Sequence, residues 1–470
     1  MTATNHSPTQ RNRQAQPLAN RRRFLQQTAR VAGATTAGLT VLRDPRSARG
    51  ALANEKILLA IIGLRGRGTH LAHGFLDRPQ KDCEIAYMCD VDSRQFPRAK
   101  EIGDRQGRMP KCVQDFREAL DDPAVHAVVS ATPDHWHALS AVWACQAGKD
   151  VYVEKPMTHN CWEGQVMIAA AKRYNRVVQV GTQNRSAPYN FAALKYIQEG
   201  KLGKIYMGKV FNQKFWANHP VVPNAPVPQG FNWDMWNGPA PEHPYNPGFH
   251  NYWNHLWRYS GGDIANDASH QIDLARWLCG VRHPKTVYSV GGRYASEGLA
   301  ETPDTQVAVW EFDNLIMIFE LTLYTPYMLK IDPEVRNSDL FPYWPQTATR
   351  IELYGTEGLM VIGRHGGGWQ VFDRPKSRQP VVRAQMYGRF PDPEHQQNFI
   401  ECIRTRNQPN APPEDGHLSS LLIHYANISY RLGGEKLRID PQTDHIIDNP
   451  RAMELFKRSY RPPWELKEVV

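Results

Sequence analysis

The chain has 470 residues, of which 41% are hydrophobic and 22% are charged, so it is long enough for two or three folded domains. Its formal net charge is +9, but residues 1–53 hold nine arginines, no lysine and a single acid, Asp44. The remaining 417 residues are therefore close to +1, and the sequence argues against a nucleic-acid partner because the positive charge belongs to the leader.

Residues 1–53 have the parts of an export signal. Arg21-Arg22-Arg23-Phe24-Leu25 precedes the mildly apolar run VAGATTAGLTVL, and Ala51-Leu52-Ala53 has the small-x-small pattern of a cleavage site. This order predicts a twin-arginine signal, with the twin-arginine export machinery as a partner and a periplasmic or otherwise extracytoplasmic location. A disordered basic tail before a short helix is the alternative. The apolar run is too short to give a stable membrane span.

Residues 54–182 alternate between apolar strand-like runs and amphipathic helix-like runs. Continuous apolar strands separated by helices are typical of a parallel sheet covered on both faces. We therefore predict an N-terminal Rossmann domain with a doubly wound parallel sheet over residues 54–182. The expected strands are 56–63, 83–92, 124–133, 150–156 and 177–183, and the expected helical runs are 67–78, 93–107, 137–148 and 161–175.

Residues 183–470 have a different texture. A proline-rich segment with five tryptophans, residues 216–259, precedes a helix at 268–278. Strand-like runs punctuated by turns follow, and two amphipathic helices close the chain. These features predict a C-terminal α/β domain with a large, open, mainly antiparallel sheet. The strand-like runs are 285–295, 305–324, 349–363 and 368–373, and the closing helices are 395–406 and 417–432.

The first predicted strand runs into a glycine turn, Gly63-Leu64-Arg65-Gly66-Arg67-Gly68. In a dinucleotide fingerprint the outer glycines allow a tight turn and close helix packing, and a middle glycine lets the backbone approach the pyrophosphate. Gly63 and Gly68 fit the outer positions, but Arg65 occupies the middle one. Gly66 is the alternative point of close approach, and a plain strand-to-helix turn is the competing interpretation.

Other candidate cofactor contacts lie at the ends of later strands. Asp90 ends the second strand, where a carboxylate accepts hydrogen bonds from the ribose hydroxyls and repels a 2′-phosphate, so NAD(H) is favoured over NADP(H). Arg94 lies close enough to weaken that preference. The predicted strand at 124–133 runs into Thr132-Pro133-Asp134-His135-Trp136-His137, at the sheet edge where ligands of such folds bind. Asp134 and His137 serve equally well as helix-capping residues.

Glu154-Lys155-Pro156 completes a set of motifs that resembles one family. With the glycine turn, CDVD at 89–92, TPDHWH at 132–137 and GGDIANDASHQIDLARW at 261–277, the chain resembles the Gfo/Idh/MocA oxidoreductases, named for glucose-fructose oxidoreductase and inositol dehydrogenase. The resemblance extends over about 55–465. It implies NAD as cofactor, with Glu154 and Lys155 beside it, and subunit contacts through the open sheet of a dimer or tetramer.

The resemblance also implies how the residues divide the chemistry. The family lysine, here Lys155, lies by the nicotinamide and the reacting carbinol. An aspartate and a histidine four residues later share the proton work; His270 matches the histidine, but Asn266 replaces the aspartate. We predict His270 as the general base and Lys155 as its electrostatic and proton partner. Asn266 cannot accept a proton, but it can bind a sugar hydroxyl or orient His270.

Two further acids stand near His270 in the sequence. On a continuous helix Asp267 points about 100° away from its neighbour, and Asp273 lies on the same face as His270, so we expect Asp273 to pair with it. Asp267 is nevertheless a candidate substrate contact, together with His270. A polar cap on a core helix is the alternative explanation for this cluster. The seven cysteines form no CxxC or CxxH pair, and no metal site is expected.

The aromatic segment 216–259 suits a carbohydrate, because aromatic rings stack on the apolar faces of sugar rings. Trp233 and Trp236 are the candidate substrate contacts, and wedging of the segment onto the sheet is the structural alternative. The predicted function is an NAD(H)-dependent oxidoreductase that transfers hydride from a secondary hydroxyl of a sugar or polyol, with tightly bound cofactor. A redox-assisted glycoside hydrolase or lyase with recycled NAD, and a non-catalytic sugar-binding protein of the same fold, are the alternatives.

Overall fold

A computed structural model of the chain describes residues 56–375 and 378–469. The predicted export signal at residues 1–53 lies outside the described residues. The described strands form two sheets, and none of the described helices is long and apolar enough to cross a membrane.

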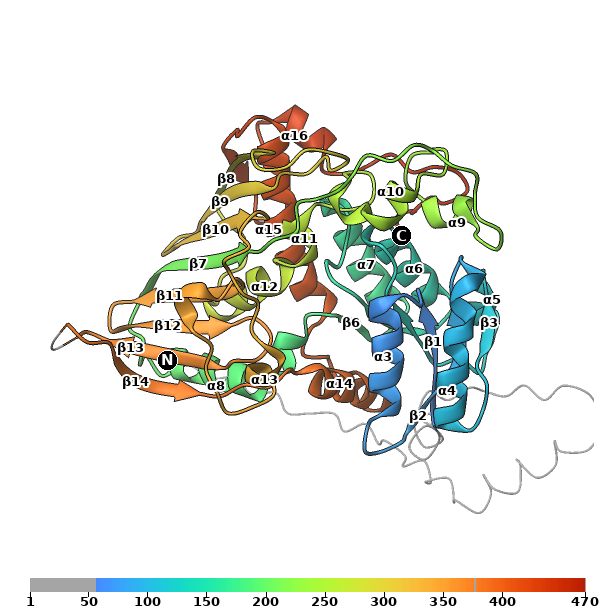
Figure 1. Cartoon of the computed structure of the whole chain (residues 1–470), viewed down its shortest axis with the longest axis horizontal. Helices are drawn as coiled ribbons and strands as arrows, with labels where there is room; N and C mark the ends of the chain where they lie inside the picture. Colours follow the sequence, from blue (N-terminus) through green and yellow to red (C-terminus); the bar gives the residue numbers. More distant parts are fainter. Residues whose placement is uncertain (1–55, 376–377, 470) are drawn as a thin grey trace, which may run out of the picture. The chain divides into compact units, whose positions relative to one another are not determined.

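The first sheet has six strands in the order β3-β2-β1-β4-β5-β6 (Figure 1). All neighbouring strands are parallel, which confirms the predicted Rossmann domain. From β1 to β3 successive strands are added on one side of β1, and from β4 to β6 they are added on the other side. Ligands of such sheets bind beyond the carboxyl ends of the strands where this order reverses, which is between β1 and β4. The strands are β1 (Ile57–Ile62), β2 (Cys83–Cys89), β3 (Lys111–Val113), β4 (Ala127–Ser130), β5 (Asp150–Val153) and β6 (Val178–Val180).

Helices cover both faces of this sheet because successive side chains of each strand point to opposite sides. Leu59 and Ile61 of β1 belong to one buried cluster, with α3 and α4, whereas Ala60 and Ile62 belong to another, with α5, α6 and α7. The covering elements are α3 (Gly66–Leu76), η1 (Ser93–Arg98), α4 (Ala99–Gln106), α5 (Arg117–Asp121), α6 (Asp134–Gln146) and α7 (Cys161–Arg173).

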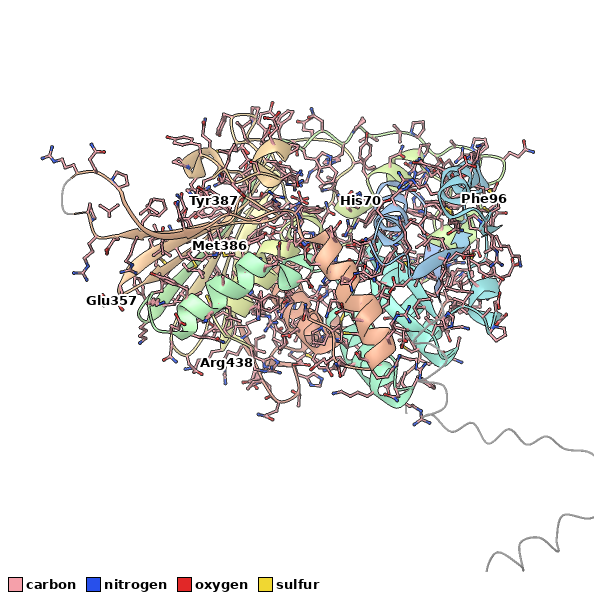
Figure 2. All side chains as sticks on the ribbon, turned by 90° about the horizontal axis from the view of Figure 1, so that it is seen from below. His70, Phe96, Glu357, Met386, Tyr387 and Arg438 are labelled. Atoms are coloured by element: carbon pink, nitrogen blue, oxygen red, sulfur yellow. The ribbon has the colours of Figure 1, made fainter. Side chains whose placement is uncertain are left out.

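One helix from late in the sequence also packs on the first sheet. Phe399 of α14 (Asp392–Thr405) shares a buried cluster with Phe75 of α3. Figure 2 shows His70 on α3 beside the start of α14, where the His70 ring lies 2.9 Å from the Asp392 carboxylate. The C-terminal part of the chain therefore supplies both a cover for the first sheet and, through Asp392, a charge at its edge.

The second sheet has ten strands in the order β14-β13-β12-β11-β7-β10-β9-β8-β15-β16. Only β7 and β10 pair in parallel among these described strands, which confirms the predicted mainly antiparallel sheet. The strands are β7 (Ile205–Gln213), β8 (Thr286–Gly292), β9 (Thr305–Glu311), β10 (Ile316–Thr322), β11 (Arg350–Gly355), β12 (Gly358–Gly363), β13 (Trp369–Asp373), β14 (Val381–Met386), β15 (Leu437–Ile439) and β16 (Ile446–Ile447).

The second sheet has one covered face and one open face. Residues of α8 (Pro188–Gln198), α12 (Ser269–Leu278) and α15 (Pro413–Arg431) share its main buried cluster. On the other face, the side chains of Tyr206 and Ile316 are 49% and 45% exposed. The open face agrees with the subunit contacts that the resemblance implies, and the number of subunits stays a prediction. Smaller elements of this domain are η2 (Gln183–Ser186), α13 (Pro333–Arg336), η4 (Trp344–Gln346) and α16 (Pro450–Glu454).

The aromatic segment 216–259 forms a small core of its own above the carboxyl ends of the first sheet's strands (Figure 1). It contains α9 (Trp233–Asn237), α10 (Pro247–Asn251) and η3 (Trp253–His255). Two backbone hydrogen bonds and side-chain contacts at 230–232 attach it to the end of β2; for example, the amide of Asn232 donates to the carbonyl of Val91 at 2.8 Å. These hydrogen bonds and the segment's own aromatic core hold it in place over the sheet.

The polar stretch at 261–278 forms two helices instead of one. α11 (Asp263–Asn266) ends before Asp267, and α12 begins at Ser269. Because of this break, the direction expected for Asp267 on a continuous helix does not apply. The predicted helix at 268–278 is confirmed within one residue.

Candidate active site

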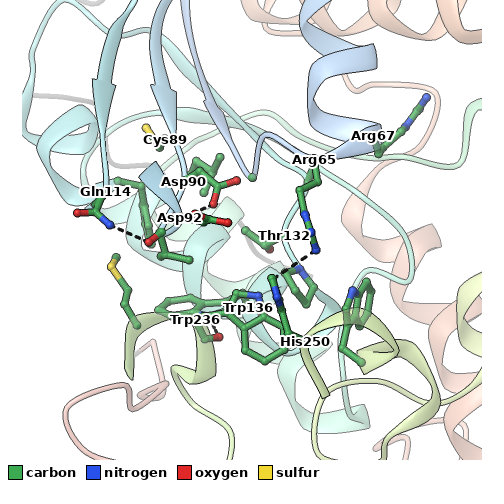
Figure 3. A pocket seen from close by; sticks show the side chains of 18 of the residues that line it. Arg65, Arg67, Cys89, Asp90, Asp92, Gln114, Thr132, Trp136, Trp236 and His250 are labelled. Carbon is green, nitrogen blue, oxygen red and sulfur yellow. Dashed lines mark hydrogen bonds between the residues drawn. The ribbon is translucent and has the colours of Figure 1, made fainter. Parts of the chain in front are cut away.

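A first cavity of about 230 Å³ lies beyond the carboxyl ends of β1, β2 and β4 (Figure 3). The glycine turn forms one wall, the end of β2 a second, and the aromatic segment a third. Predicted cofactor residues on its lining are Gly63, Arg65, Gly66, Arg67, Asp90, Thr132 and Pro133.

The outer glycines of the turn are required by the packing. Gly63 has a φ of +86°, and a Cβ there would lie 2.7 Å from the carbonyl oxygen of Ala131. A Cβ on Gly68 would lie 1.7 Å from the carbonyl oxygen of Gly63, which no side chain can occupy. Gly66 has open space around it. These contacts agree with the tight turn and close helix packing of a dinucleotide fingerprint.

The start of α3 is built to receive an anion. Arg65 is the N-cap residue, but its side chain makes no capping hydrogen bond to the helix. The first amides of α3 therefore face the cavity without a side-chain acceptor, as at helix ends that bind phosphate groups. Arg65 instead extends toward the aromatic segment, where its Nη1 lies 3.4 Å from Nε2 of His250 (Figure 3).

Asp90 is fixed in position at the end of β2. Its two carboxylate oxygens accept hydrogen bonds from the amides of Leu64 at 2.8 Å and Asp92 at 2.9 Å. Each oxygen keeps a further lone pair for a ribose hydroxyl, and burial raises the pKa of the carboxyl. Arg94 is held by Asp92, with Nε 2.6 Å from Oδ1, so it is not free to receive a 2′-phosphate.

The tryptophans of the aromatic segment do not all reach a cavity. Trp236 lines the first cavity, beside the predicted dinucleotide contacts. Trp233 stacks on Trp236 with ring centroids 4.8 Å apart, and its indole N–H donates to the carbonyl of His243. Trp233 lines neither cavity described here. Trp253, which was not among the predicted substrate contacts, lines both.

A second cavity, of about 340 Å³, lies next to the first. Arg67, Ala131, Thr132 and Trp253 line both cavities, so the two spaces share this part of their walls. The second cavity brings together residues from both domains, which the sequence placed far apart. Its predicted site residues are Asp134, Glu154, Lys155, Asn266, Asp267 and His270.

Lys155 points into the second cavity from the end of β5. Its ammonium group donates to the backbone carbonyl of Asn266 and lies 3.4 Å from the Asn266 side-chain oxygen. Burial lowers the pKa of Lys155, while the nearby carboxylates of Asp267 and Glu154 oppose that change. The charged amine is therefore less stable than in water, which suits a group that exchanges a proton or a hydrogen bond with a substrate.

His270 is 4% exposed and lines the same cavity. Burial, with the charges of Lys155 and Arg364, holds its pKa well below the usual value, so the ring is neutral. Its Nδ1 is buried without a hydrogen-bond partner among the described residues, and the ring lies 4.2 Å from that of His365. A neutral imidazole that lines a cavity can accept a proton from a bound ligand.

Asn266 serves Lys155 more directly than His270. Besides its contacts with Lys155, its side-chain amide lies 3.3 Å from a carboxylate oxygen of Asp263. The predicted pairing of Asp273 with His270 is wrong. Asp273 lies 2.9 Å from Nε of the buried Arg185 and accepts a hydrogen bond from Ser419 at 2.6 Å. It therefore pairs with a cation that is distant in the sequence, and not with His270.

Asp267 lines the second cavity within a group of cations. Lys214, Lys330 and Arg364 lie 2.5, 3.2 and 2.8 Å from its carboxylate oxygens. Burial alone raises the pKa of Asp267, but these cations hold it well below its usual range. Asp267 is therefore an anchor for three positive side chains and not a general base.

The remaining predicted residues are bound within the protein. Asp134 accepts a hydrogen bond from Ser260 at 2.5 Å, and burial raises its pKa. His137 lines neither cavity; its ring nitrogens lie 2.7 and 2.9 Å from the carbonyls of Pro156 and Thr132. It thus supports the backbone at both motifs. Among the described residues no group of three or more acidic, histidine or cysteine side chains is placed to hold a metal ion.

Arg67 ties the glycine turn to the lysine motif. Its Nε lies 2.6 Å from Glu154, and its Nη1 lies 2.6 Å from Asp392 at the start of α14. Sequence reasoning missed Asp392, and also Arg336, Arg364 and His365 of the second cavity. The one local sequence feature near these residues is the run Gly366-Gly367-Gly368, which directly follows Arg364-His365. All three glycines have positive φ angles, so the run marks an unusual backbone turn beside the cavity.

Comparison with known proteins assigns the family. Residues 57–182 match "Oxidoreductase family, NAD-binding Rossmann fold", residues 192–361 match "GFO/IDH/MocA C-terminal domain", and residues 356–466 match "Oxidoreductase family, C-terminal alpha/beta domain". The chain belongs to the Gfo/Idh/MocA family of oxidoreductases.

Individual relatives are similar over different lengths. A levoglucosan dehydrogenase of Pseudarthrobacter phenanthrenivorans is 32% identical over 171 residues, which are 35% of this chain but only 36% of that protein. scyllo-Inositol 2-dehydrogenase (NAD(+)) of Bacillus subtilis is 25% identical over 385 residues, covering 81% of this chain and 95% of the relative.

The fold is shared with solved structures of such enzymes. A levoglucosan dehydrogenase in complex with NADH and levoglucosan superposes with a TM-score of 0.61 at 20% identity, covering 82% of this chain and 99% of that one. The family, the glycine turn and Asp90 together make this chain an NAD-dependent oxidoreductase with NAD bound by its Rossmann domain.

Proposed function

We propose that this chain oxidises a secondary hydroxyl of a carbohydrate or polyol by hydride transfer to NAD. The observation that carries the proposal is the position of the two cavities: Lys155 and His270 line the second one, which shares Thr132 and Trp253 with the lining of the dinucleotide cavity. Two of the relatives reported above are a levoglucosan dehydrogenase and a scyllo-inositol 2-dehydrogenase. Their names support a cyclic polyhydroxylated substrate for this chain as well.

The protein's residues divide the work around one hydroxyl group. Bound NAD supplies the hydride acceptor. The neutral ring of His270 accepts the hydroxyl proton, and the Lys155 ammonium stabilises the negative charge that develops on the oxygen. Asn266 keeps Lys155 in position through its backbone and side-chain oxygens. Asp267 has too many cationic partners to accept the proton.

The attachment of the aromatic segment beside the first cavity supports retention of the cofactor. Hydrogen bonds of 2.8–2.9 Å join residues 230–232 of the aromatic segment to Val91, Ser93 and Gln114. A dinucleotide held under this segment would have to be reduced and reoxidised without leaving. This favours the second candidate, a redox-assisted glycoside hydrolase or lyase with recycled NAD, in which oxidation acidifies a neighbouring C–H and allows a glycosidic group to leave.

Product analysis separates the two candidates. A dehydrogenase converts the substrate to a ketone with one NADH formed per product, whereas a recycled cofactor gives free sugar from a glycoside without net NADH. The experiment incubates the protein with NAD and a set of sugars, polyols and glycosides, and follows NADH absorbance and products together. Binding of sugars with neither product would favour the non-catalytic alternative, and failure to bind NAD would contradict both enzyme proposals.

We also propose that the protein acts outside the cytoplasm, because residues 1–53 have the parts of an export signal. The arginine pattern at 21–23 and the Ala51-Leu52-Ala53 sequence support export by the twin-arginine route, which carries folded proteins with their cofactors. Secretion of the full chain with loss of residues 1–53 is the expected result, and replacement of Arg21, Arg22 and Arg23 by lysine should keep the protein in the cytoplasm. We infer a dimer or tetramer from the open face of the second sheet.

A further inference from the structure

The second cavity carries positive side chains that the proposed hydride transfer does not use. Arg336, the last residue of α13, and Arg364, just after β12, both line it together with Lys155. Arg67 also lines the cavity, but Glu154 and Asp392 balance its charge. The uncompensated charge is therefore concentrated at the wall formed by the C-terminal domain.

Arg336 has no carboxylate partner among the described residues. Its Nε is buried and makes no hydrogen bond, and its guanidinium group lies over the ring of Phe390, 5.1 Å from the centroid. A guanidinium group that is partly withdrawn from water without an acceptor is costly, because its N–H groups lose their hydrogen bonds. An acceptor inside the cavity would remove that cost.

The nearest acid cannot provide this acceptor. Asp267 already binds Lys214, Lys330 and Arg364, so one negative charge faces three positive ones. Lys214 has a second carboxylate partner in Asp263 at 3.0 Å, whereas Lys330 and Arg364 pair with no acid other than Asp267 among the described residues. The pKa of Arg336 is lowered, first by burial and then by Arg364, as expected for cations that lack a shared anion.

The two imidazoles beside the arginines each have a buried ring nitrogen whose hydrogen bonding is unsatisfied. His365, which is 4% exposed, has Nε2 without a partner among the described residues, and its neighbour His270 has Nδ1 in the same condition. Both rings line the second cavity. The cavity thus combines Arg336, which has no acidic partner among the described residues, and Arg364, which shares Asp267 with two lysines, with neutral polar groups; this is a donor set for an anionic polyhydroxylated ligand.

We infer that the substrate is an acidic carbohydrate, a uronate or aldonate, whose carboxylate is bound by Arg336 and Arg364. This inference rests on the proposed function and names its substrate class. Planar guanidinium groups bind carboxylates in a two-point geometry, and one carboxylate supplies the single negative charge that Arg336 lacks. The pyrophosphate of NAD does not take this place, since its predicted binding site is the start of α3 in the first cavity.

The test compares matched acidic and neutral ligands by binding, without turnover. Calorimetry on the holoenzyme saturated with NADH would measure glucuronate against glucose, galacturonate against galactose, gluconate against sorbitol, and glucose 6-phosphate. We expect at least one sugar acid to bind about 10–100-fold more tightly than its neutral partner, with an affinity that falls as salt rises.

Two variants assign the effect to Arg336. Arg336→Gln should remove about 10–100-fold of the affinity for the acid and leave NADH binding unchanged. Arg438→Gln is the control, because Arg438 is an exposed arginine that pairs with Asp448 at 3.2 Å, and it should change neither affinity. Arg336→Lys should restore part of the binding of the acid.

The outcomes separate this inference from the proposed function. Binding of NADH with equal affinity for acidic and neutral partners, no detectable sugar acid binding, tighter binding of glucose 6-phosphate, or an unchanged Arg336→Gln variant would overturn the carboxylate site alone. Loss of NADH binding itself in the unaltered protein would instead overturn the proposed function.

Discussion

The two residues of the proposed proton-transfer pair, Lys155 and His270, are buried among charged side chains, and burial and these charges shift the pKa of both groups. The Lys155 amine is fixed by Asn266, and the His270 ring is kept neutral by burial and by neighbouring cations. An asparagine at 266 can hold the lysine without competing for the proton, because an amide does not ionise in this range. The replacement of the family aspartate is thus compatible with catalysis by the remaining pair.

Removing either member of the pair tests this division of work. Lys155→Ala and His270→Ala should each lower kcat by about 10²–10⁴-fold, because general acid–base groups contribute that much. NADH affinity, measured by fluorescence titration, should change little. Lys100→Ala, which removes an exposed lysine paired with Asp104, is the control. Full activity in either active-site variant would show that the proton is handled elsewhere.

Asp90 makes a separate prediction about the cofactor. Asp90→Ala removes the ribose acceptor and should weaken NADH binding by about 10–100-fold, the effect of losing hydrogen bonds to a charged group. Asp90→Asn keeps the size but not the charge, so it should reduce the preference for NADH over NADPH. Equilibrium titration with both dinucleotides measures this. Unchanged NADH affinity in Asp90→Ala would contradict the ribose assignment.

At the scale of elements, the joint between β1 and α3 depends on one glycine more than on its neighbour. Gly68→Ala drives a Cβ onto the carbonyl of Gly63 and should lower the free energy of unfolding by about 1–3 kcal/mol, as other overpacked sites do. Gly66→Ala meets open space and should leave stability unchanged or slightly higher. Denaturant unfolding of the two variants measures the difference; equal stabilities would refute the packing argument.

Local motifs predicted the elements that carry the cofactor. The apolar strands, the glycine turn and Asp90 lie within one strand-helix-strand unit, where spacing alone fixes their relation. The same was not possible for Arg336, Arg364 and Asp392, because tertiary packing brings them to Lys155 from remote segments. The pairing of Asp273 with Arg185 likewise depends on a partner far away in the sequence.

Across the whole molecule, buried neutral histidines should make stability depend on pH. Burial lowers the pKa of His135 and His424 to about 3 and of His250 and His395 to about 4. In the unfolded chain these groups titrate near 6.5, so between about pH 6.5 and 4 the unfolded state binds more protons. Stability is therefore complete above this range and falls as the pH drops through it.

The slope of the unfolding free energy against pH gives the number of histidines that are neutral when folded and protonated when unfolded. Each one contributes about 1.4 kcal/mol per pH unit within the range, and unfolding free energies measured from pH 7.5 to 4.5 provide the total. His395→Gln should reduce the slope by one proton, whatever its effect on stability at neutral pH. A free energy that is constant between pH 7 and 5 would contradict burial of these rings as neutral groups.

The central claim is that NAD lies beside Lys155 and His270 in one continuous site. The most direct measurement is to purify the exported protein without added cofactor, denature it, and assay the released NAD(H) and NADP(H) against protein, with Lys155→Ala prepared in parallel. We predict close to one NAD(H) per chain in both, with oxidation of an added carbohydrate by the unaltered protein alone. A protein that is empty and does not bind added NAD would contradict the account.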